Sequence, residues 1–258
     1  MTTRSSYSSG TATQPLLGET IGTAFDNTVA RFADNEALVV LHQNIRWTYK
    51  ELQQQVNLCA RALLAIGVQR GDRVAIWSPN RYEWVLTQLA TAKMGAILVN
   101  INPAYRTHEL DYALNHSQAR YLVTADSFKT SDYRAMLYEL APELAHCPVG
   151  ELNASKLPLL KGVINLDTQA HAGMWRWADF MHMGEEIPQH TLTQRQASLQ
   201  FDDAINIQYT SGTTGFPKGA TLSHHNILNN GYFVAQSMNF TDQDRLVMPV
   251  PLYHCFGM

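Results

Sequence analysis

The sequence contains few cysteines, few charged side chains and no long hydrophobic run. Its three cysteines, Cys59, Cys147 and Cys255, are odd in number, far apart and without Cys-x-x-Cys spacing, so they predict neither a disulfide framework nor a zinc site. We expect reduced, mostly buried thiols, as in a cytoplasmic protein. The most hydrophobic stretch, 84–101, is interrupted by Thr, Gln, Lys and Gly. It therefore predicts a helix followed by a strand, and we expect no integral membrane segment.

A strong excess of charge of one sign is also lacking. Lys plus Arg number 19 and Asp plus Glu number 22, which gives a formal net charge of −3. This balance supplies no basic field for nucleic acid or an anionic membrane, so we expect no nucleic-acid partner. Charged residues make up 16% and apolar residues 45% of the 258 residues. This composition excludes disorder of the whole chain and predicts a large buried core in one or two domains.

The first residues are rich in small hydroxyl side chains. Residues 1–14 hold eight Ser and Thr, one Arg and no apolar stretch. A secretory signal needs an apolar stretch, and a transit peptide needs several arginines in an amphipathic pattern. We therefore expect a disordered tail over 1–18 and a cytoplasmic location.

Helical and strand-like patterns alternate along residues 19–200. The first pattern is helical, at 21–32, and the apolar segments 37–41 and 45–48 then bracket a polar turn, which predicts a small N-terminal hairpin. Further strands are expected at 73–77, 96–101, 121–124 and 162–166, with helices at 82–94, from 107 onward and over 131–145. Strands separated by helices indicate βαβ units around a mostly parallel sheet. The predicted fold class is therefore α/β.

Capping residues mark several of the predicted helix ends. Thr48 and Glu51 have the spacing of a capping box before an apolar helical pattern. Gly67 and Gly95 stand where helix C-caps belong, and Thr107 is expected to cap the helix that follows it.

Two segments are less regular. Residues 169–200 show neither a helical nor a strand period. Their three histidines, His171, His182 and His190, are 11 and 8 residues apart, a spacing that favours surface or packing roles over a metal site. Near the end of the chain, the apolar segment 246–250 predicts a strand.

The segment richest in chemistry is 205–219. A strand-like run at 205–209 leads into ten residues, 210–219, that hold four hydroxyl side chains, three glycines and one lysine, Lys218. Glycines let successive backbone N–H groups converge on anionic oxygens, hydroxyls add donors, and a lysine adds a point charge suited to a polyphosphate. The composition also fits a flexible surface loop, but a strand entering directly and Pro217 beside the lysine favour a phosphate-binding loop.

This loop differs from the P-loop of nucleotide-binding proteins. That motif places its lysine before Ser or Thr at the start of a helix, whereas Lys218 precedes Gly219 and a second strand-like run, 219–222. Ser223 is then expected to cap a helix that begins near His224. The loop is therefore predicted to join two strands of a hairpin. His224 and His225 are helix-start residues to which we assign no function.

Residues 209–219, YTSGTTGFPKG, resemble the phosphate-loop motif of the acyl-adenylate-forming (AMP-binding) superfamily over eleven consecutive positions. Residues 251–257, PLYHCFG, resemble the next motif of that family, whose histidine or aromatic residue lies at the acyl end of the active site. The segments 101–106 and 223–233 are most similar to the fatty-acyl-CoA synthetase/ligase branch. The resemblance extends from about residue 18 to 258.

The resemblance implies a two-step ligation. A carboxylate attacks the α-phosphorus of ATP, bound with Mg²⁺, to give acyl-AMP and pyrophosphate, and the thiol of CoA then displaces AMP. The implied substrates are a fatty acid, ATP and CoA, and the protein mainly aligns anions and neutralises charge. By position, His254 is the catalytic candidate, which orients the carboxylate or gates the acyl tunnel, and no residue is assigned to a metal. The candidates for holding the β- and γ-phosphates are Thr210, Ser211, Gly212, Thr213, Thr214, Gly215 and Lys218.

The sequence departs from the family pattern by ending at Met258. The family's adenine and ribose contacts, a Thr-Glu pair, the barrel and the C-terminal domain with its lysine have no counterpart here. We expect 19–200 to form the first α/β subdomain, with the N-terminal hairpin, and 201–258 to begin the second, which carries the phosphate loop. These 258 residues alone are therefore expected to be inactive.

Two other functions remain open at this point. An aryl- or other acid–CoA ligase is kept as an alternative, because the absent part lines much of the family's acyl pocket. A non-catalytic phosphate- or nucleotide-binding module is the alternative from a different class. Acyl chain length and assembly, including a homo-oligomer, are not predicted by these residues.

Overall fold

A seven-stranded sheet organises the computed structural model, which describes residues 14–210 and 217–257. The strands lie in the order β11-β10-β4-β3-β5-β8-β9, and all neighbours are parallel except the antiparallel pair β10–β11. Their bounds are β3 Arg73–Trp77, β4 Ile97–Ile101, β5 Tyr121–Thr124, β8 Gly162–Asn165, β9 Met174–Arg176, β10 Ala204–Thr210 and β11 Lys218–Ser223. The predicted α/β class with a mostly parallel sheet is confirmed.

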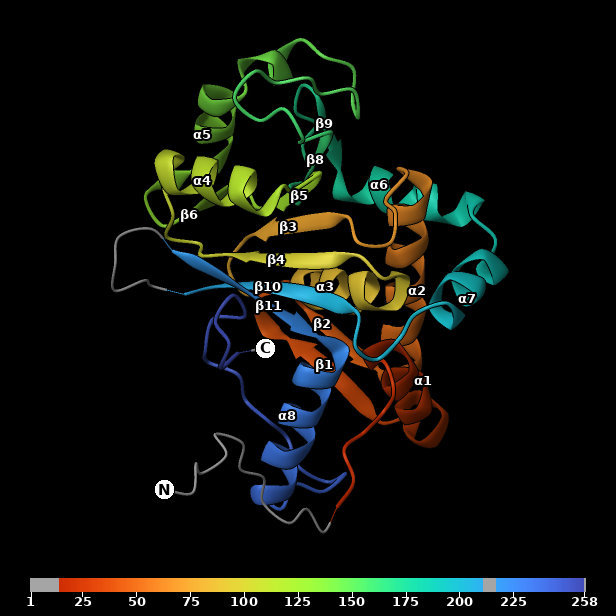
Figure 1. The fold of residues 1–258 in the computed structure, drawn as a ribbon. Helices are drawn as coiled ribbons and strands as arrows, with labels where there is room; N and C mark the ends of the chain where they lie inside the picture. Colours follow the sequence, from red (N-terminus) through yellow and green to blue (C-terminus); the bar gives the residue numbers. More distant parts are fainter. Residues whose placement is uncertain (1–13, 211–216, 258) are drawn as a thin grey trace, which may run out of the picture.

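Helices cover both faces of this sheet. They are α1 Ile21–Phe32, α2 Tyr49–Ala65, α3 Tyr82–Met94, α4 Thr107–Ser117, α5 Tyr133–Leu140, α6 Trp177–Met183, α7 Gln189–Ala197 and α8 His224–Ser237. In Figure 1, α4 and α5 lie above the sheet, and α8 lies below it with the hairpin of β1 (Glu36–Val40) and β2 (Ile45–Thr48). A further short pair, β6 Ser127–Phe128 and β7 Ser131–Asp132, precedes α5.

Two hydrophobic cores result from this layering. Alternate residues of a strand point to opposite faces, so Val74 and Ile76 of β3 pack with α2, α3 and α6, whereas Ala75 and Trp77 pack with α4 and α5. On the second face, the Trp77 ring stacks on the Tyr133 ring with centroids 3.5 Å apart. Burial on both faces explains why these strands are apolar without polar alternation.

Local signals place the helix ends. Thr48 and Glu51 form the predicted capping box of α2, with the Glu51 amide N–H donating to the Thr48 hydroxyl at 3.2 Å and the Glu51 carboxylate accepting from the Thr48 N–H at 2.8 Å. Gly67 and Gly95 follow α2 and α3 with φ of 87° and 79°, the left-handed conformation that favours glycine. Ser223 caps α8 as predicted.

Several local predictions are wrong. Thr107 is the first residue of α4 and not its cap, which is Arg106. The helix expected over 131–145 ends at Leu140, and a short 3-10 helix, Pro142–Ala145, follows it. Segment 246–250 forms no strand, because Pro249 lacks a donor and no strand of the described part pairs with it; Val247 is 82% exposed.

The strand order reverses within the sheet, and other α/β sheets bind ligands at reversals of this kind. The chain runs from β3 to β4 on one side and then crosses to β5 on the other side of β3. Such a reversal leaves a crevice outside the carboxyl ends of the strands, where doubly wound sheets bind ligands. Because β10 is parallel to its neighbour β4, Thr210 ends on the same edge of the sheet.

The strands of 201–258 join the sheet formed by the earlier residues. β10 pairs with β4, and β11 pairs with β10 at the sheet edge. A division at residue 200 therefore stays a prediction about the whole protein. The tail expected over 1–18 lies largely outside the described residues. Of its last residues, Leu17 is bonded to α8: its backbone N–H donates to Oδ1 of Asn229 at 2.8 Å, and its carbonyl accepts from Nδ2 of Asn229 at 3.1 Å.

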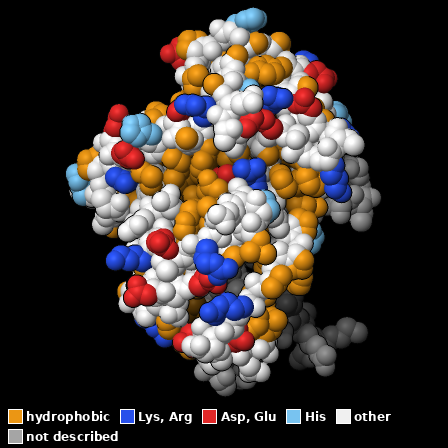
Figure 2. Space-filling model, turned by 180° about the vertical axis from the view of Figure 1, so that it is seen from behind, with side chains coloured by type: hydrophobic (Ala, Val, Ile, Leu, Met, Phe, Trp, Pro, Cys, Tyr) orange, Lys and Arg blue, Asp and Glu red, His pale blue; other side chains and the backbone are white. Residues whose placement is uncertain are grey.

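Charge is mixed on the face of the molecule that Figure 2 draws. Figure 2 shows acidic and basic side chains interspersed on one face, with no large area of a single sign. Within the described residues, no helix is both long enough and apolar enough to cross a membrane.

All three cysteines are free, but only Cys59 is buried; Cys255 is exposed, which corrects the expectation of mostly buried thiols.

Candidate functional site

The β10–β11 hairpin brings the two ends of the predicted phosphate loop together. Thr210, the last residue of β10, pairs with Lys218, the first residue of β11, and the Thr210 hydroxyl donates to the Lys218 carbonyl at 3.5 Å. Both residues are exposed. The two paired strands on either side of the predicted loop are therefore confirmed. The other phosphate-binding candidates lie outside the described residues: Ser211, Gly212, Thr213, Thr214 and Gly215.

Helix α4 supports both ends of this loop. The Tyr112 hydroxyl donates to the Pro217 carbonyl at 3.1 Å, just before Lys218. The Tyr209 hydroxyl, just before Thr210, donates to the Ala113 carbonyl at 3.3 Å and lies 3.0 Å from Nδ1 of His116. Burial raises the pKa of Tyr209 to about 12, so its phenol stays protonated and holds these contacts.

Sequence reasoning missed this support. Tyr112 and His116 are four residues apart, and their rings stack with centroids 5.0 Å apart. Residues at this spacing lie on one face of a helix. The spacing could have indicated a polar aromatic pair on α4, but nothing in it indicated contact with the loop.

His254 lies in a tight turn near the end of the chain. Its backbone N–H donates to the Pro251 carbonyl at 3.0 Å, and its carbonyl accepts from the Gly257 N–H at 2.8 Å. The Phe256 N–H donates to Nδ1 of His254 at 3.2 Å. A neutral imidazole that accepts at Nδ1 carries its proton on Nε2. The exposed His254 side chain therefore offers an N–H donor that suits a carboxylate oxygen.

The His254 turn and the phosphate-loop hairpin are attached to one another. The side-chain amide of Gln208, on β10, donates to the Tyr253 carbonyl. Asn80, just after β3, also bonds the turn, at Val250 and Leu252. The structure thus brings His254 to the strand that ends in Thr210, at the carboxyl-end edge of the sheet.

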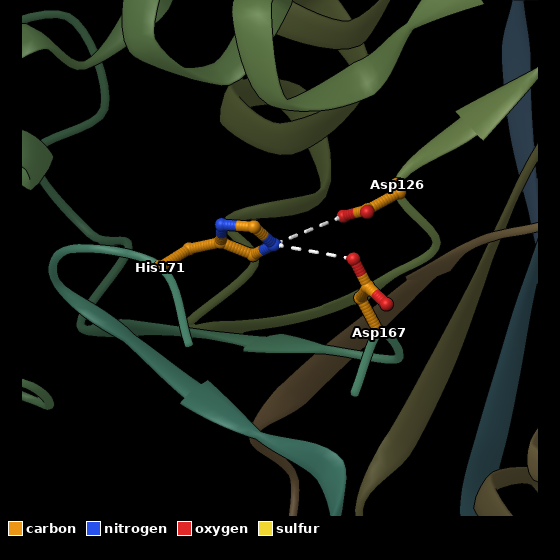
Figure 3. A group of neighbouring side chains, drawn as sticks. All are labelled: Asp126, Asp167 and His171. Atoms are coloured by element: carbon orange, nitrogen blue, oxygen red, sulfur yellow. Dashed lines mark ion pairs between the residues drawn. The ribbon is translucent and has the colours of Figure 1, made fainter. Parts of the chain in front are cut away.

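One group among the described residues has the donor atoms of a metal site. Asp126 follows β5 and Asp167 follows β8, and Nε2 of His171 lies 3.5 Å from a carboxylate oxygen of each (Figure 3). Burial and the neighbouring Asp167 raise the pKa of Asp126. The hydrogen bond from Asp126 lowers the pKa of Asp167 to about 2. The Arg134 guanidinium is 3.6 Å from Asp126. Because the Arg134 cation already faces the Asp126 carboxylate, we interpret the group as an ion-pair network that joins two loops.

Two cavities lined by described residues lie elsewhere. One, of about 390 Å³, is lined by α1, α2, α3 and α7 and contains the ion pair of Lys93 and Asp26, with Nζ to Oδ1 at 2.6 Å. Burial lowers the pKa of Lys93 although Asp26 opposes this shift. The other, of about 590 Å³, lies between α1 and α8. Neither is lined by Thr210, Lys218 or His254.

His224 has a structural role at the start of α8. It is fully buried, and its Nδ1 accepts the Ile21 N–H at 3.2 Å, which joins the first turn of α1 to α8. Burial lowers its pKa to about 4, so the ring is neutral at physiological pH. His225 packs its ring near Phe201, with centroids 5.4 Å apart. Both histidines thus make contacts within the fold.

Comparison with known proteins places this geometry in a family. The AMP-binding enzyme family matches residues 25–258. The zebrafish (Danio rerio) protein named "Medium-chain acyl-CoA ligase ACSF2, mitochondrial" is 45% identical over 258 residues, which cover 99% of this chain and 42% of that protein. The human protein of the same name is 42% identical, over 98% of this chain and 42% of its own length. The chain thus spans less than half the length of these relatives.

Solved structures share the fold. The N-terminal domain of FACL13 from Mycobacterium tuberculosis has a TM-score of 0.73 at 23% identity, over 92% of this chain and 52% of that one. The long-chain-fatty-acid-CoA ligase FadD1 from Archaeoglobus fulgidus has a TM-score of 0.71 at 21% identity, over 96% and 45%. At such identity the likeness concerns the fold, whereas the family match covers most of the sequence. The chain therefore belongs to the AMP-binding enzyme family.

Proposed function

We propose that this chain supplies the phosphate-binding part of an ATP-dependent acid–CoA ligase. The observation that carries the proposal is the β10–β11 hairpin, which sets Thr210 and Lys218 at the two ends of a glycine- and hydroxyl-rich segment. Hydroxyl groups, glycine backbone and one ammonium are the donors that a polyphosphate needs. In this proposal Thr210, Ser211, Gly212, Thr213, Thr214, Gly215 and Lys218 hold the β- and γ-phosphates of ATP.

The proposed acid is a medium-chain fatty acid. The name of the 45% identical relative supports this substrate class. The acid's carboxylate attacks the α-phosphorus of ATP and releases pyrophosphate; CoA thiol then attacks the acyl carbon and releases AMP. His254, through Nε2–H, is proposed to orient the carboxylate for the first step, since alignment of two anions is most of what this step requires.

Magnesium is assigned to no residue of this chain. The described donors at the loop ends are a hydroxyl and an ammonium, and an ammonium has no lone pair to offer a metal ion. They suit phosphate oxygens. Mg²⁺ would therefore accompany the phosphates of the substrate ATP.

We also propose that these 258 residues alone catalyse neither half-reaction, because the relatives have more than half of their length outside the matched part. A cytoplasmic location is kept as part of the proposal. The vertebrate relatives carry the word mitochondrial in their names, so targeting of this chain is a separate question, to be tested by fractionation.

Replacing Lys218 by alanine in the whole enzyme, at the length of its relatives, tests the phosphate-binding role. Loss of a charge-assisted hydrogen bond worth about 1.5–3 kcal/mol should lower kcat/KM for ATP in adenylation about 10- to 150-fold. Attack of CoA on preformed acyl-AMP should be nearly unchanged, because the lysine acts on phosphates. Lys50→Ala, which removes an exposed lysine at the start of α2, is the matched control. An adenylation rate of Lys218→Ala within about twofold of the control would contradict the proposal.

A further inference from the structure

A single side-chain amide clamps the turn that carries His254. Nδ2 of Asn80 donates to the Val250 carbonyl at 2.9 Å, and Oδ1 of Asn80 accepts the Leu252 N–H at 2.7 Å. Asn80 lies just after β3, at the central part of the sheet's carboxyl-end edge. One amide therefore satisfies a backbone acceptor and a backbone donor of the same turn, which fixes both its distance and its orientation.

A second amide also holds this turn. Gln208 is 4% exposed on β10. Its Nε2 donates to the Tyr253 carbonyl, and its Oε1 accepts from Nδ2 of Asn100 on β4 at 3.0 Å. The bond from Asn100 determines which way the Gln208 amide faces, and buried hydrogen-bond chains of this kind restrict each member to one orientation. The residue that precedes His254 is thereby fixed to β10, two positions before Thr210.

Hydrogen bonds within the turn tie its residues to one another. His254 is bonded within it to Pro251, Phe256 and Gly257. A Cβ on Gly257 would lie 2.3 Å from the Pro251 carbonyl oxygen, so the backbone there is closely packed. Any shift of the Asn80 and Gln208 contacts would therefore carry the imidazole with it, without changing its tautomer.

We propose that Asn80 and Gln208 are positioning residues for the acid substrate: they fix the His254 turn against the strand that ends in the phosphate loop. This inference rests on the proposed function, in which His254 faces the carboxylate. Asn80 makes its two bonds to the turn, and neither reaches β10 or β11. Loss of Asn80 should therefore weaken use of the acid and leave ATP binding intact, a separation that general destabilisation would not produce.

The test compares two changes at Asn80 with one control in the whole enzyme. Asn80→Leu removes both bonds, and we expect the KM for a C8 fatty acid to rise at least tenfold while the KM for ATP stays within twofold. Asn80→Asp retains the acceptor for the Leu252 N–H and should recover part of the loss. Asn102→Leu is the matched control, because Asn102 follows β4 and its side chain bonds the backbone of Ala104; its KM for the acid should be unchanged.

A second measurement tests the Asn80 bonds to the turn without an activity assay. In the 258-residue chain, NMR hydrogen exchange of the Leu252 amide should be slow, and Asn80→Leu should speed it at least tenfold while the Val99 amide in the sheet core stays protected. An unchanged Leu252 exchange rate would overturn the clamp. If Val99 also loses protection, Asn80→Leu is unfolded, and Asn80→Asp decides instead. Because Asp lacks the donor to the Val250 carbonyl, the Leu252 amide of Asn80→Asp must exchange faster than that of the wild type.

His254→Ala separates failure of this inference from failure of the proposed function. If His254→Ala raises the KM for the acid but folded Asn80→Leu does not, the positioning role is wrong and the proposed function stands. If His254→Ala leaves the KM for the acid unchanged, the proposed role of His254 is wrong, and the inference is overturned with it. Equal rises in the KM values for acid and ATP in Asn80→Leu would also overturn the positioning role.

Discussion

The ion pair of Asp26 and Lys93 predicts an unequal response to loss of either partner. The Lys93 side chain is 3% exposed, whereas that of Asp26 is 32% exposed. Burial would raise the pKa of Asp26, but hydrogen bonds from Lys93, Gln196 and Gln53 hold it below its usual value. Asp26 therefore has other partners and access to water, and Lys93 has neither to the same degree. We expect Asp26→Asn to destabilise the fold much more than Lys93→Met.

The burial of Lys93 sets the magnitude. Without the carboxylate, the lysine can at worst release its proton at pH 7, which costs about 5 kcal/mol for an ordinary pKa of about 10.5. Breaking a buried pair costs about 3–5 kcal/mol. Since the amide in Asp26→Asn still accepts a hydrogen bond, we expect a loss of about 3 kcal/mol. In Lys93→Met, whose side chain has similar shape, Asp26 keeps its amide partners and water, so we expect about 1 kcal/mol.

Urea unfolding of the 258-residue chain at pH 7 measures both losses, provided that the variants share one m-value. A pH series adds a check. In Asp26→Asn the folded chain releases the Lys93 proton at a lower pH than the unfolded chain does, so the free energy of unfolding rises with pH as that proton is lost, and the defect shrinks toward pH 10. Equal losses in the two variants, or a loss in Asp26→Asn below about 1 kcal/mol, would refute the reasoning.

Three further predictions concern other parts of the chain. The pKa of His224 is about 4 in the folded chain, against an ordinary 6.5, so as pH falls the unfolded chain takes up this proton before the folded chain does. The free energy of unfolding, measured by urea titration, should therefore fall by about 3 kcal/mol between pH 6.5 and 4, and by less in His224→Gln. Tyr112→Phe, which removes only the hydroxyl on the Pro217 carbonyl, should raise the KM for ATP and spare that for the acid; the reverse pattern would contradict support of the loop. Large hydrophobic side chains near the C-terminus are exposed: Val234, Met238, Phe240, Leu246, Val247 and Phe256. They should make the 258-residue chain self-associate, as measured by light scattering, and a monomer at high concentration would contradict this.

The sequence predicted those parts of the fold that depend on neighbours in the chain. The capping box of Thr48 and the left-handed glycines Gly67 and Gly95 are local signals, since their partners lie within a few residues. The buried strands were equally predictable, because each face of the sheet requires apolar side chains. The elements within 169–200 were missed because α6, α7 and β9 have only seven, nine and three residues, too few to establish a period.

The same distinction explains what was predicted of the candidate site. A loop that binds phosphate needs consecutive N–H groups and hydroxyls, so its residues must be contiguous, and 209–219 is recognisable as a motif. The groups that hold the loop and the His254 turn act across the fold. Asn80 reaches Val250 across 170 positions, and Tyr112 reaches Pro217 across 105. No spacing in the sequence indicates such pairs.

Side chains that hold a site in place are thus the part of an enzyme that a sequence reveals least, although their contacts are short and specific. Asn80 looks like a residue of an ordinary Ser-Pro-Asn loop, because the carbonyl and the N–H that it binds belong to a turn formed much later in the chain. Its identity matters only once β3 and the His254 turn are adjacent. A rise in the KM for the acid without a rise in the KM for ATP is therefore the observation that decides whether this adjacency serves catalysis or only folding.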